Sequence, residues 1–434
     1  MKQRLVVIGN GMAGMKTVEE ILAASPDQFE ITVFGAEPHG NYNRIMLSPV
    51  LSGEKTLDEI MINDRQWYAD NGITLLAGED KFVVDIDRGK RCVIARDGTQ
   101  VHYDRLLIAT GSKPFILPVP GNDLQGVIAF RDIADVETML SYAKSRRHAV
   151  VLGGGLLGLE AANGLVEQGM DVTVIHNNAI LLNRQLDNEA AKLLQAELEA
   201  RGVTFKMPAQ TEALVDDGTG HVSAVRFADG SELPCDLFVM AIGVRPNIAL
   251  AEKVGLYCEK GIVVNDTLQT FDPSVYAVGE CVQHRNQTFG LVAPLFDQAK
   301  ACANHLCGHG VAGYATLPTA TKLKVTGIHL FSVGNFLGDA ECEFLLFRDL
   351  AAGNYKKLVL KNNRIIGAVL YGDTSEGAWY QELLEQRVDI TPMRGLLIFG
   401  RAYAEPLLLN SESNQATVKS VVSDGKQTVT ENVA

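Results

Sequence analysis

The sequence lacks the features that mark membrane, disulfide-stabilised and nucleic-acid-binding proteins. No run of about 18 consecutive apolar residues occurs, so we expect no transmembrane helix. The seven cysteines are odd in number and scattered, which favours a reducing cytoplasm over a disulfide scaffold. The formal net charge is −13 and there is no basic stripe, so a phosphate backbone would be repelled. These absences predict a cytoplasmic protein that binds neither membrane nor nucleic acid.

The composition is otherwise that of a folded protein of several domains. The chain has 434 residues, of which 47% are apolar and 21% charged. At about 100–200 residues per domain, this length predicts two to four domains. The start, MKQRLVVIG, resembles a signal peptide in having positive charges before apolar residues. The apolar run stops at Gly9 and no small-residue cleavage site follows, so we expect no signal peptide.

A glycine-rich turn follows the first apolar stretch. Residues 5–8 (LVVI) predict a short buried parallel strand, and residues 15–24 have helical character. Between them, Gly9, Gly11 and Gly14 give the spacing G-x-G-x-x-G. The first glycine permits a tight turn, the second lets a pyrophosphate approach the backbone, and the third lets helix and strand pack closely. The pattern predicts a dinucleotide site at the start of the helix.

The residues after this turn support that interpretation. Residues 30–34 (EITVF) predict a second strand, and Glu37 follows it, 23 residues after Gly14. A carboxylate at this place accepts hydrogen bonds from a ribose hydroxyl. The alternative is a tight strand-to-helix turn that binds no ligand, and the following strand and acid argue against it.

The same pattern returns 144 residues further along the chain. Residues 149–152 (AVVL) predict a strand, and residues 160–167 continue as a helix. The intervening glycines again follow G-x-G-x-x-G, at Gly153, Gly155 and Gly158. We therefore expect a second dinucleotide site.

The second site departs from the first at the end of its next strand, residues 171–176 (DVTVIH). No acid follows there; His176 stands at the strand end and Arg184 lies eight residues on. An acid would repel the 2′-phosphate of NADP, whereas His and Arg would not. The site therefore does not exclude NADP. The alternative, that His176 only caps the strand and Arg184 is a solvated charge, stays open.

Two dinucleotide sites in one chain are typical of a flavoprotein that holds FAD and admits NADH or NADPH. Three further stretches fit this class: YDRLLIATGSKP at residues 103–114, CDLFVMAIGVRPN at 235–247, and TFDPSVYAVGECVQH at 270–284. Together with both glycine runs, over about 300 residues, they resemble the flavoprotein reductases with two dinucleotide-binding domains. That group includes the rubredoxin and ferredoxin reductases.

A closer resemblance covers about 400 residues. The stretches GNGMAGMKTVEE, FGAEPHGNYNRIMLS, ILLNRQLD, VGECVQHRNQTFGLVAPLFDQAK and TKLKVTGIHLFS are similar to the flavin half of assimilatory NAD(P)H-nitrite reductase large subunits. They are equally similar to the electron-transfer subunits of assimilatory nitrate reductases. The resemblance implies an FAD-dependent NAD(P)H oxidoreductase that passes electrons to a redox protein, either a nitrate or nitrite reductase component or a small iron–sulfur protein.

The resemblance assigns cofactor roles residue by residue, with no acid or base catalyst because hydride transfer needs none. The implied FAD residues are Gly9, Gly11, Gly14, Glu37, Arg44, Thr110, Gly111, Gly279 and Glu280. The NAD(P) residues, with His176 and Arg184 added from the strand-end argument, are Gly153, Gly155, Gly158, Glu160, His176, Arg184 and Gly243. Many ferredoxin and rubredoxin reductases carry a lysine beside the flavin where Pro49 follows Ser48, so that role does not transfer.

The expected fold class is α/β, with two Rossmann-like, three-layer dinucleotide-binding domains and a small α+β C-terminal domain. The FAD domain is split between residues 1–118 and 250–311, and the NAD(P)H domain occupies 119–249. Residues 312–409 form the third domain, which this group often places at a subunit interface, so a homodimer is among the expectations. Asn362-Asn363 predicts a hairpin turn, and residues 375–387 a helix with a serine start.

The polar residues 410–434 predict a mobile tail. In the full nitrite reductases, an iron–sulfur domain and a sirohaem domain follow near this point, and no cysteine occurs after Cys342. The segment CANHLCGH contains Cys302 and Cys307, which do not share a helix face, so we expect structural cysteines and no metal site.

Two other functions compete with the nitrate or nitrite assignment. The chain is alternatively a stand-alone rubredoxin or ferredoxin reductase, which a gene-neighbour or metal-centre observation would distinguish. A third interpretation is a non-enzymatic protein that binds FAD and senses NADH, and slow turnover with every acceptor would favour it.

Overall fold

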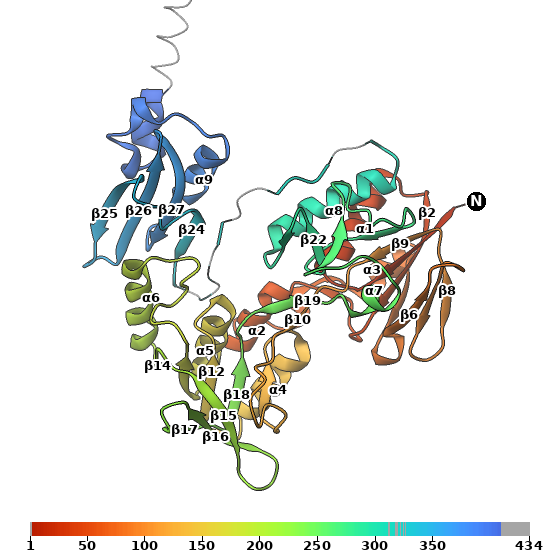
Figure 1. Cartoon of the computed structure of the whole chain (residues 1–434), viewed down its shortest axis with the longest axis horizontal. Helices are drawn as coiled ribbons and strands as arrows, with labels where there is room; N and C mark the ends of the chain where they lie inside the picture. The colour runs from red at the N-terminus through yellow and green to blue at the C-terminus, as the bar shows by residue number, and fades with distance from the viewer. Residues whose placement is uncertain are drawn as a thin grey trace, which may run out of the picture. The chain divides into compact units, whose positions relative to one another are not determined.

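The computed structural model describes residues 2–310, 313–316, 320–321, 323, 325 and 327–408. Within these residues the chain divides into two compact units. The first unit comprises Met1–Ala179 and Leu198–Leu317, and the second comprises Ile180–Glu197 and Pro318–Ala434. Figure 1 shows their helices and strands and labels many of them.

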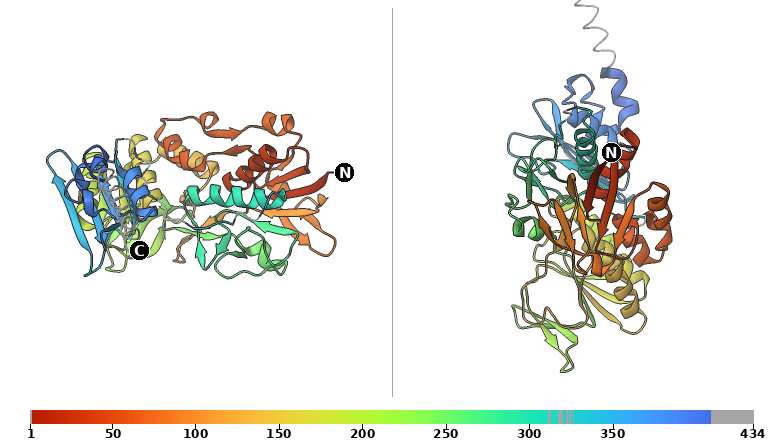
Figure 2. Two further views of the ribbon diagram at one scale, coloured as in Figure 1. Left: turned by 90° about the horizontal axis from the view of Figure 1, so that it is seen from above. Right: turned by 90° about the vertical axis from the view of Figure 1, so that its right-hand side faces the viewer.

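The first unit contains two five-stranded parallel sheets. The sheet that begins at the N-terminus has the strand order β21–β9–β1–β2–β5. Its strands are β1 (Gln3–Ile8), β2 (Phe29–Gly35), β5 (Thr74–Ala77), β9 (Arg105–Ile108) and β21 (Val275–Ala277). The two long helices α1 (Met12–Ala24) and α8 (Val292–Leu306) lie side by side, as Figure 2 shows. Elements cover both faces of a parallel sheet, which is why β1 is an almost continuous apolar run.

A small antiparallel sheet packs its apolar side chains against the other face of the first sheet. Its strands are β6 (Val83–Asp87), β7 (Cys92–Ala95) and β8 (Gln100–His102). Val83, Ile86 and Val93 join the same buried cluster as Leu5 and Leu107. Cys92 of β7 is also buried.

The second parallel sheet repeats the arrangement of the first, in the order β11–β18–β12–β13–β14. Its strands are β11 (Val127–Ala129), β12 (His148–Leu152), β13 (Asp171–Ile175), β14 (Val203–Lys206) and β18 (Leu237–Met240). The associated helices are α4 (Ile133–Ala143) and α5 (Leu156–Glu167). A second small antiparallel sheet consists of β15 (Thr211–Asp216), β16 (Val222–Phe227) and β17 (Glu232–Pro234). It packs Leu214 and Val225 against Val150 and Phe238 of the parallel sheet.

The α/β class is therefore confirmed, and the predicted strands at residues 5–8, 30–34 and 149–152 are present. The division into separate FAD and NAD(P)H domains stays a prediction.

The remaining elements of the first unit are α2 (Leu47–Ser52), α3 (Arg65–Asp70), α7 (Ala249–Lys253), β3 (Asn41–Tyr42), β4 (Met61–Asn63), β10 (Ser112–Pro114), β19 (Val244–Pro246), β20 (Ile262–Val264), β22 (Val282–His284) and β23 (Gln287–Thr288).

The second unit is built on an antiparallel sheet in the order β24–β27–β26–β25. Its elements are β24 (Leu330–Gly334), β25 (Glu343–Asp349), β26 (Asn354–Lys361), β27 (Arg364–Tyr371) and α9 (Gly377–Glu385). Asn362 and Asn363 make the expected hairpin turn, with φ of +51° and +54°. The helix does not have the predicted serine start. Its N-cap is Glu376, and the Ser375 hydroxyl bonds to Asp373 instead.

Residues 180–197 also belong to the second unit, which the predicted NAD(P)H domain at 119–249 did not anticipate. They include most of α6 (Asn188–Ala200). The predicted tail, residues 410–434, lies outside the described residues.

Candidate functional site: two glycine turns

The first glycine turn is fixed by close backbone approaches that only glycine permits. Gly9 has a φ of +113°, and a Cβ there would lie 2.1 Å from the carbonyl oxygen of Ala109. A Cβ on Gly14 would lie 2.8 Å from the carbonyl oxygen of Gly9. Gly11 differs, because a Cβ there would meet no atom within 4 Å. Gly9 and Gly14 therefore close the turn, while Gly11 faces open space where a ligand would have access.

The second turn has the same geometry. Gly153 has a φ of +130°, and its Cβ would lie 2.4 Å from the carbonyl oxygen of Ala241. A Cβ on Gly158 would lie 2.0 Å from the carbonyl oxygen of Gly153, and one on Gly155 would meet nothing within 4 Å. Gly11 has φ −90° and ψ 179°, and Gly155 has φ −88° and ψ 178°. The two predicted dinucleotide turns are therefore local copies of each other.

Both turns fit a pyrophosphate. At the starts of α1 and α5, no side chain among the described residues caps the helix, and neither first turn contains an acid. The first N–H groups of each helix therefore point away from the helix without a side-chain acceptor. Unpaired N–H groups and the positive end of the helix dipole together form an anion-binding site. The open side at Gly11 and Gly155 is where the phosphate groups of FAD and of a nicotinamide coenzyme would be held.

Glu37 and Arg44 are brought together beyond the end of β2. The Arg44 guanidinium forms an ion pair with Glu37, and the Tyr42 hydroxyl donates to the same carboxylate at 2.7 Å. Burial raises the pKa of Tyr42, and the neighbouring Glu37 acts in the same direction, so this hydroxyl stays a donor. The sequence analysis assigned Glu37 to a ribose hydroxyl and named Arg44 as a separate FAD residue. Their cofactor roles stay predictions, but the ion pair shows that they are not independent.

Arg131 and Ser112 join the candidate FAD site and were missed by the sequence analysis. Arg131 forms an ion pair with Glu280, and the Ser112 hydroxyl donates to Glu280 at 2.7 Å. Arg44 donates from Nη1 to the carbonyl oxygen of Arg131 at 3.2 Å. Ion pairs and hydrogen bonds, one of them through the backbone carbonyl of Arg131, thus form a row of contacts that links Glu37 to Glu280. No spacing signal marks Arg131, since its partner lies 149 residues away.

A half-buried carboxylate, Asp135, lies beside these residues. Asp132 and Asp135 form a capping box at the start of α4, and Asp135 accepts from the backbone N–H of Arg131 at 2.6 Å. Burial raises the pKa of Asp135 to about 6, and the nearby carboxylates of Asp132 and Glu37 add to the rise.

The loops that carry Thr110, Gly111 and Gly243 lie against each other. The Thr110 hydroxyl donates to the carbonyl oxygen of Asn247 at 2.8 Å, and Asn247 N donates to Gly111 O at 2.9 Å. In the other direction, Phe115 N donates to the carbonyl oxygen of Gly243 at 2.9 Å. Strands β10 and β19 continue this pairing as an antiparallel ribbon. The two A-x-G loops, which follow one strand of each parallel sheet, are thus mutually fixed.

Glu160 of α5 is held by a hydrogen bond from a neighbouring helix. It is buried in α5, and the Ser48 hydroxyl of α2 donates to its carboxylate at 2.6 Å. Gly279, by contrast, is held by Gln298, whose side-chain oxygen accepts its N–H at 2.8 Å. Pro49 stands where related reductases carry a lysine. The preceding residue, Ser48, supplies a neutral hydrogen-bond donor to Glu160. The coenzyme role of Glu160 stays a prediction.

The two basic residues predicted at the second site, His176 and Arg184, lie in different compact units. His176 directly follows β13, where its carbonyl oxygen accepts from Ala209 N at 2.8 Å. His176-Asn177-Asn178 places no carboxylate at the strand end. Arg184 is exposed and belongs to the second unit. Its predicted contact with the coenzyme is therefore untested.

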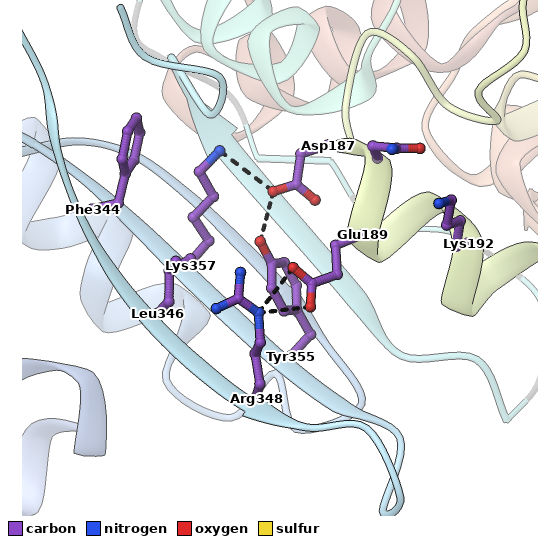
Figure 3. A pocket seen from close by; sticks show the side chains of 9 residues that line it. Asp187, Glu189, Lys192, Phe344, Leu346, Arg348, Tyr355 and Lys357 are labelled. Atoms are coloured by element: carbon purple, nitrogen blue, oxygen red, sulfur yellow. Dashed lines mark hydrogen bonds and ion pairs between the residues drawn. The ribbon is translucent and has the colours of Figure 1, made fainter. Parts of the chain in front are cut away.

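The second unit contains a cavity of about 480 Å³ that the sequence analysis did not indicate (Figure 3). It lies between the start of α6 and strands β25 and β26. Its lining residues are Asp187, Asn188, Glu189, Lys192, Phe344, Leu346, Arg348, Tyr355 and Lys357. In the part of the chain that the structure describes, no group of three His, Cys, Asp or Glu side chains is arranged to hold a metal.

Comparison with known proteins decides the family. Residues 3–301 match the family described as pyridine nucleotide-disulphide oxidoreductase. The chain belongs to this family. Residues 319–388 of this oxidoreductase match the domain described as the rubredoxin NAD+ reductase C-terminal domain. Family membership supports binding of FAD and NAD(P)H by the oxidoreductase.

Individual relatives of the oxidoreductase are similar over nearly its whole length. It is 49% identical over 390 residues to a nitrite reductase (NAD(P)H) of Bacillus subtilis (strain 168), covering 90% of this chain and 48% of the relative. It is 45% identical over 390 residues to the assimilatory nitrate reductase electron transfer subunit of the same organism, covering 90% and 50%. The chain therefore spans about half the length of these two relatives.

A solved structure also matches the oxidoreductase. The covalent putidaredoxin reductase–putidaredoxin complex contains a chain with a TM-score of 0.83 and 26% identity, covering 94% of this chain and 99% of that one. Among the described residues, no helix is long and apolar enough to cross a membrane.

Proposed function

We propose that this oxidoreductase takes electrons from NADH or NADPH through FAD and delivers them to a protein partner in nitrate or nitrite assimilation. The observation that carries the proposal is the pair of matching glycine turns, each open only at its second glycine, at Gly11 and Gly155. The similarity to the Bacillus nitrite reductase and nitrate reductase subunit supports the choice of pathway.

In this proposal the chain's own residues bind and orient the cofactors. The N–H groups at the start of α1 and the row from Glu37 to Glu280 would hold FAD, and the start of α5 would hold the coenzyme phosphates. FAD supplies the ability to accept two electrons as hydride and to release them singly. The paired loops at Thr110 and Gly243 would keep the two binding regions in register, because orientation is the main requirement of hydride transfer.

The electron acceptor separates this function from that of a complete reductase. We expect the FAD-loaded protein to reduce ferricyanide or a viologen dye rapidly with NAD(P)H, and to leave nitrate and nitrite unchanged. Nitrite reduction needs a centre that binds and activates the oxyanion, and the chain's seven cysteines show no iron–sulfur spacing. Adding the cognate reductase or a small iron–sulfur protein should restore NAD(P)H-dependent reduction.

The measurement is ammonium and nitrite accounting on the flavoprotein alone, after removal of contaminating metal. Stoichiometric ammonium from nitrite under those conditions would show that the protein is a complete reductase. If the partner's docking face is basic, the rate of electron transfer from this acidic chain to the partner should fall as the salt concentration increases.

A second candidate is a rubredoxin reductase, which the match of residues 319–388 favours. In that case rubredoxin alone should accept electrons at a rate that the nitrate or nitrite reductase component does not exceed. The same assay, run with both acceptors at equal concentration, distinguishes the two.

The preference for NADH or NADPH tests whether the residue at the end of β13, His176, lies beside the coenzyme ribose. We expect the wild type to use both NADH and NADPH, because no carboxylate stands at His176. His176→Glu should lower the NADPH/NADH ratio of kcat/KM by about five- to tenfold, since a carboxylate there repels the 2′-phosphate. Asn177→Asp, one residue further at an exposed position, is the charge-matched control. An unchanged ratio in His176→Glu would place the ribose elsewhere.

A further inference from the structure

The cavity of about 480 Å³ in the second unit is lined by one face of a strand pair and by the start of α6 (Figure 3). Phe344, Leu346 and Arg348 alternate along β25, so their side chains share a face of that strand. In the β25–β26 ladder, Leu346 opposes Lys357 and Arg348 opposes Tyr355. The whole lining belongs to the second unit, so the cavity is built without the first.

Both carboxylates of the lining are already bound by other side chains of the cavity. Asp187 accepts through Oδ2 from the Tyr355 hydroxyl at 2.7 Å and lies 3.4 Å from the Lys357 ammonium (Figure 3). Glu189 accepts from Arg348 Nε with both oxygens, at 2.7 and 3.0 Å. A cationic ligand would therefore have to displace Lys357 or Arg348 to reach a carboxylate.

Donor groups, by contrast, are left over. Lys192 on α6 is exposed, and it makes no hydrogen bond or ion pair with any part of the chain that the structure describes. Arg348 binds Glu189 through Nε, and its two Nη atoms point away from that carboxylate (Figure 3). The lining holds three cations and two carboxylates, a net charge of +1, in a chain whose formal net charge is −13. The cavity therefore favours an anion.

The apolar part of the lining is exposed beside these donors. The exposed fractions of Phe344 and Leu346 are 44% and 42%, and both lie on β25, the edge strand of its sheet. The Lys357 ammonium lies 4.9 Å from the centre of the Phe344 ring. A ligand with an apolar group would remove Phe344 and Leu346 from water, which the hydrophobic effect favours.

We propose that this cavity binds an organic anion, a molecule with a carboxylate at one end and an aryl or alkyl group at the other. The carboxylate would pair with the Nη atoms of Arg348 and with Lys192, and the apolar group would cover Phe344 and Leu346. Inorganic oxyanions would use only the donors, and neutral apolar molecules only the apolar wall. The proposal is independent of the FAD and coenzyme sites, which lie in the first unit.

The experiment is calorimetric titration of the full-length, FAD-loaded protein with 4-phenylbutyrate. Two further probes each lack one half of the molecule: 4-phenylbutan-1-ol lacks the charge, and acetate lacks the apolar group. We expect 4-phenylbutyrate to bind at one site per chain with a Kd at least about tenfold lower than that of either probe, because only it uses both parts of the lining.

Three variants test the residues assigned to the ligand. Lys192→Gln should raise the Kd of 4-phenylbutyrate about three- to fivefold, as loss of an exposed ion pair does. Arg348→Lys keeps a cation for Glu189 but removes the Nη fork, and should raise the Kd about five- to tenfold. Phe344→Ser should raise it roughly tenfold through lost apolar contact. All three positions are exposed, so circular dichroism should show a folded protein.

Two matched controls make the same changes outside the cavity in the second unit. Lys361→Gln removes a lysine from the other end of β26, and Phe399→Ser removes a phenylalanine that is 53% exposed. Neither residue lines the cavity. Both variants should bind 4-phenylbutyrate with the affinity of the wild type.

The proposal is overturned if 4-phenylbutyrate shows no saturable binding, or if all three variants at the cavity stay within twofold of the wild-type Kd. Equal affinity for 4-phenylbutan-1-ol would reduce the site to an apolar surface, and equal affinity for acetate to a cluster of cations; either result also contradicts the proposal. Sedimentation tests a different occupant. If Phe344→Ser and Lys192→Gln convert a dimer to a monomer while the controls do not, the cavity is covered by a second copy of the chain and the ligand assignment is wrong.

Discussion

Gly11→Val should give a folded protein without flavin. A valine Cβ at this position meets no protein atom within 4 Å, and a φ of −90° with a ψ of 179° is extended backbone that valine adopts readily. The added methyl groups would instead occupy the open side of the turn, where the pyrophosphate of FAD must approach the N–H groups of α1. We expect flavin per chain to fall by roughly tenfold or more.

The measurement is flavin absorbance against protein concentration after purification in added FAD, with circular dichroism as the test of folding. Gly9→Val is the informative contrast, because its Cβ would lie 2.1 Å from Ala109 O and should prevent the turn from forming at all. A yellow Gly11→Val protein with one FAD per chain would remove the first turn from the cofactor site.

Gly155→Val should show the reverse behaviour. The turn geometry is the same, and a Cβ there also meets nothing within 4 Å. The variant should keep its flavin, and a chemical reductant such as dithionite should still reduce it. Reduction by subsaturating NADH or NADPH should fall by about a hundredfold or more, because the coenzyme phosphates lose access to the start of α5.

Stopped-flow flavin reduction measures this loss directly. The two variants form a reciprocal pair, since each serves as the folding control for the other. If Gly155→Val lost flavin as readily as Gly11→Val, the assignment of one cofactor to each turn would be wrong. If it were reduced at the wild-type rate, the coenzyme would bind elsewhere.

The sequence was sufficient for features that depend on a few neighbouring residues. Gly9 and Gly153 adopt the expected turns because local sterics leave glycine as the only solution. Asn362 and Asn363 form the hairpin turn because asparagine tolerates positive φ. Similar logic failed at Ser375, where Asp373 competes for the hydroxyl that was expected to cap the helix.

Features that depend on contacts between residues far apart in the chain could not be predicted from the sequence. Glu280 was identified from its motif, but its partner Arg131 has no motif of its own and reaches it across 149 positions. The grouping of residues 180–197 with the C-terminal sheet was equally hidden. An amphipathic helix shows that one face is buried, but its pattern does not say which surface will cover it.

The near identity of the two glycine turns has a consequence for inhibitor chemistry. A small molecule that mimics only a pyrophosphate would meet the same backbone at Gly11 and Gly155, and so would have no basis for choosing between the turns. Selectivity would have to come from a second group on the molecule that reaches the strand ends. There the two turns differ in their side chains: the ion pair of Glu37 with Arg44 follows one strand, and His176 follows the other. A second group that complements one of these strand ends would therefore make the same phosphate mimic favour the corresponding turn.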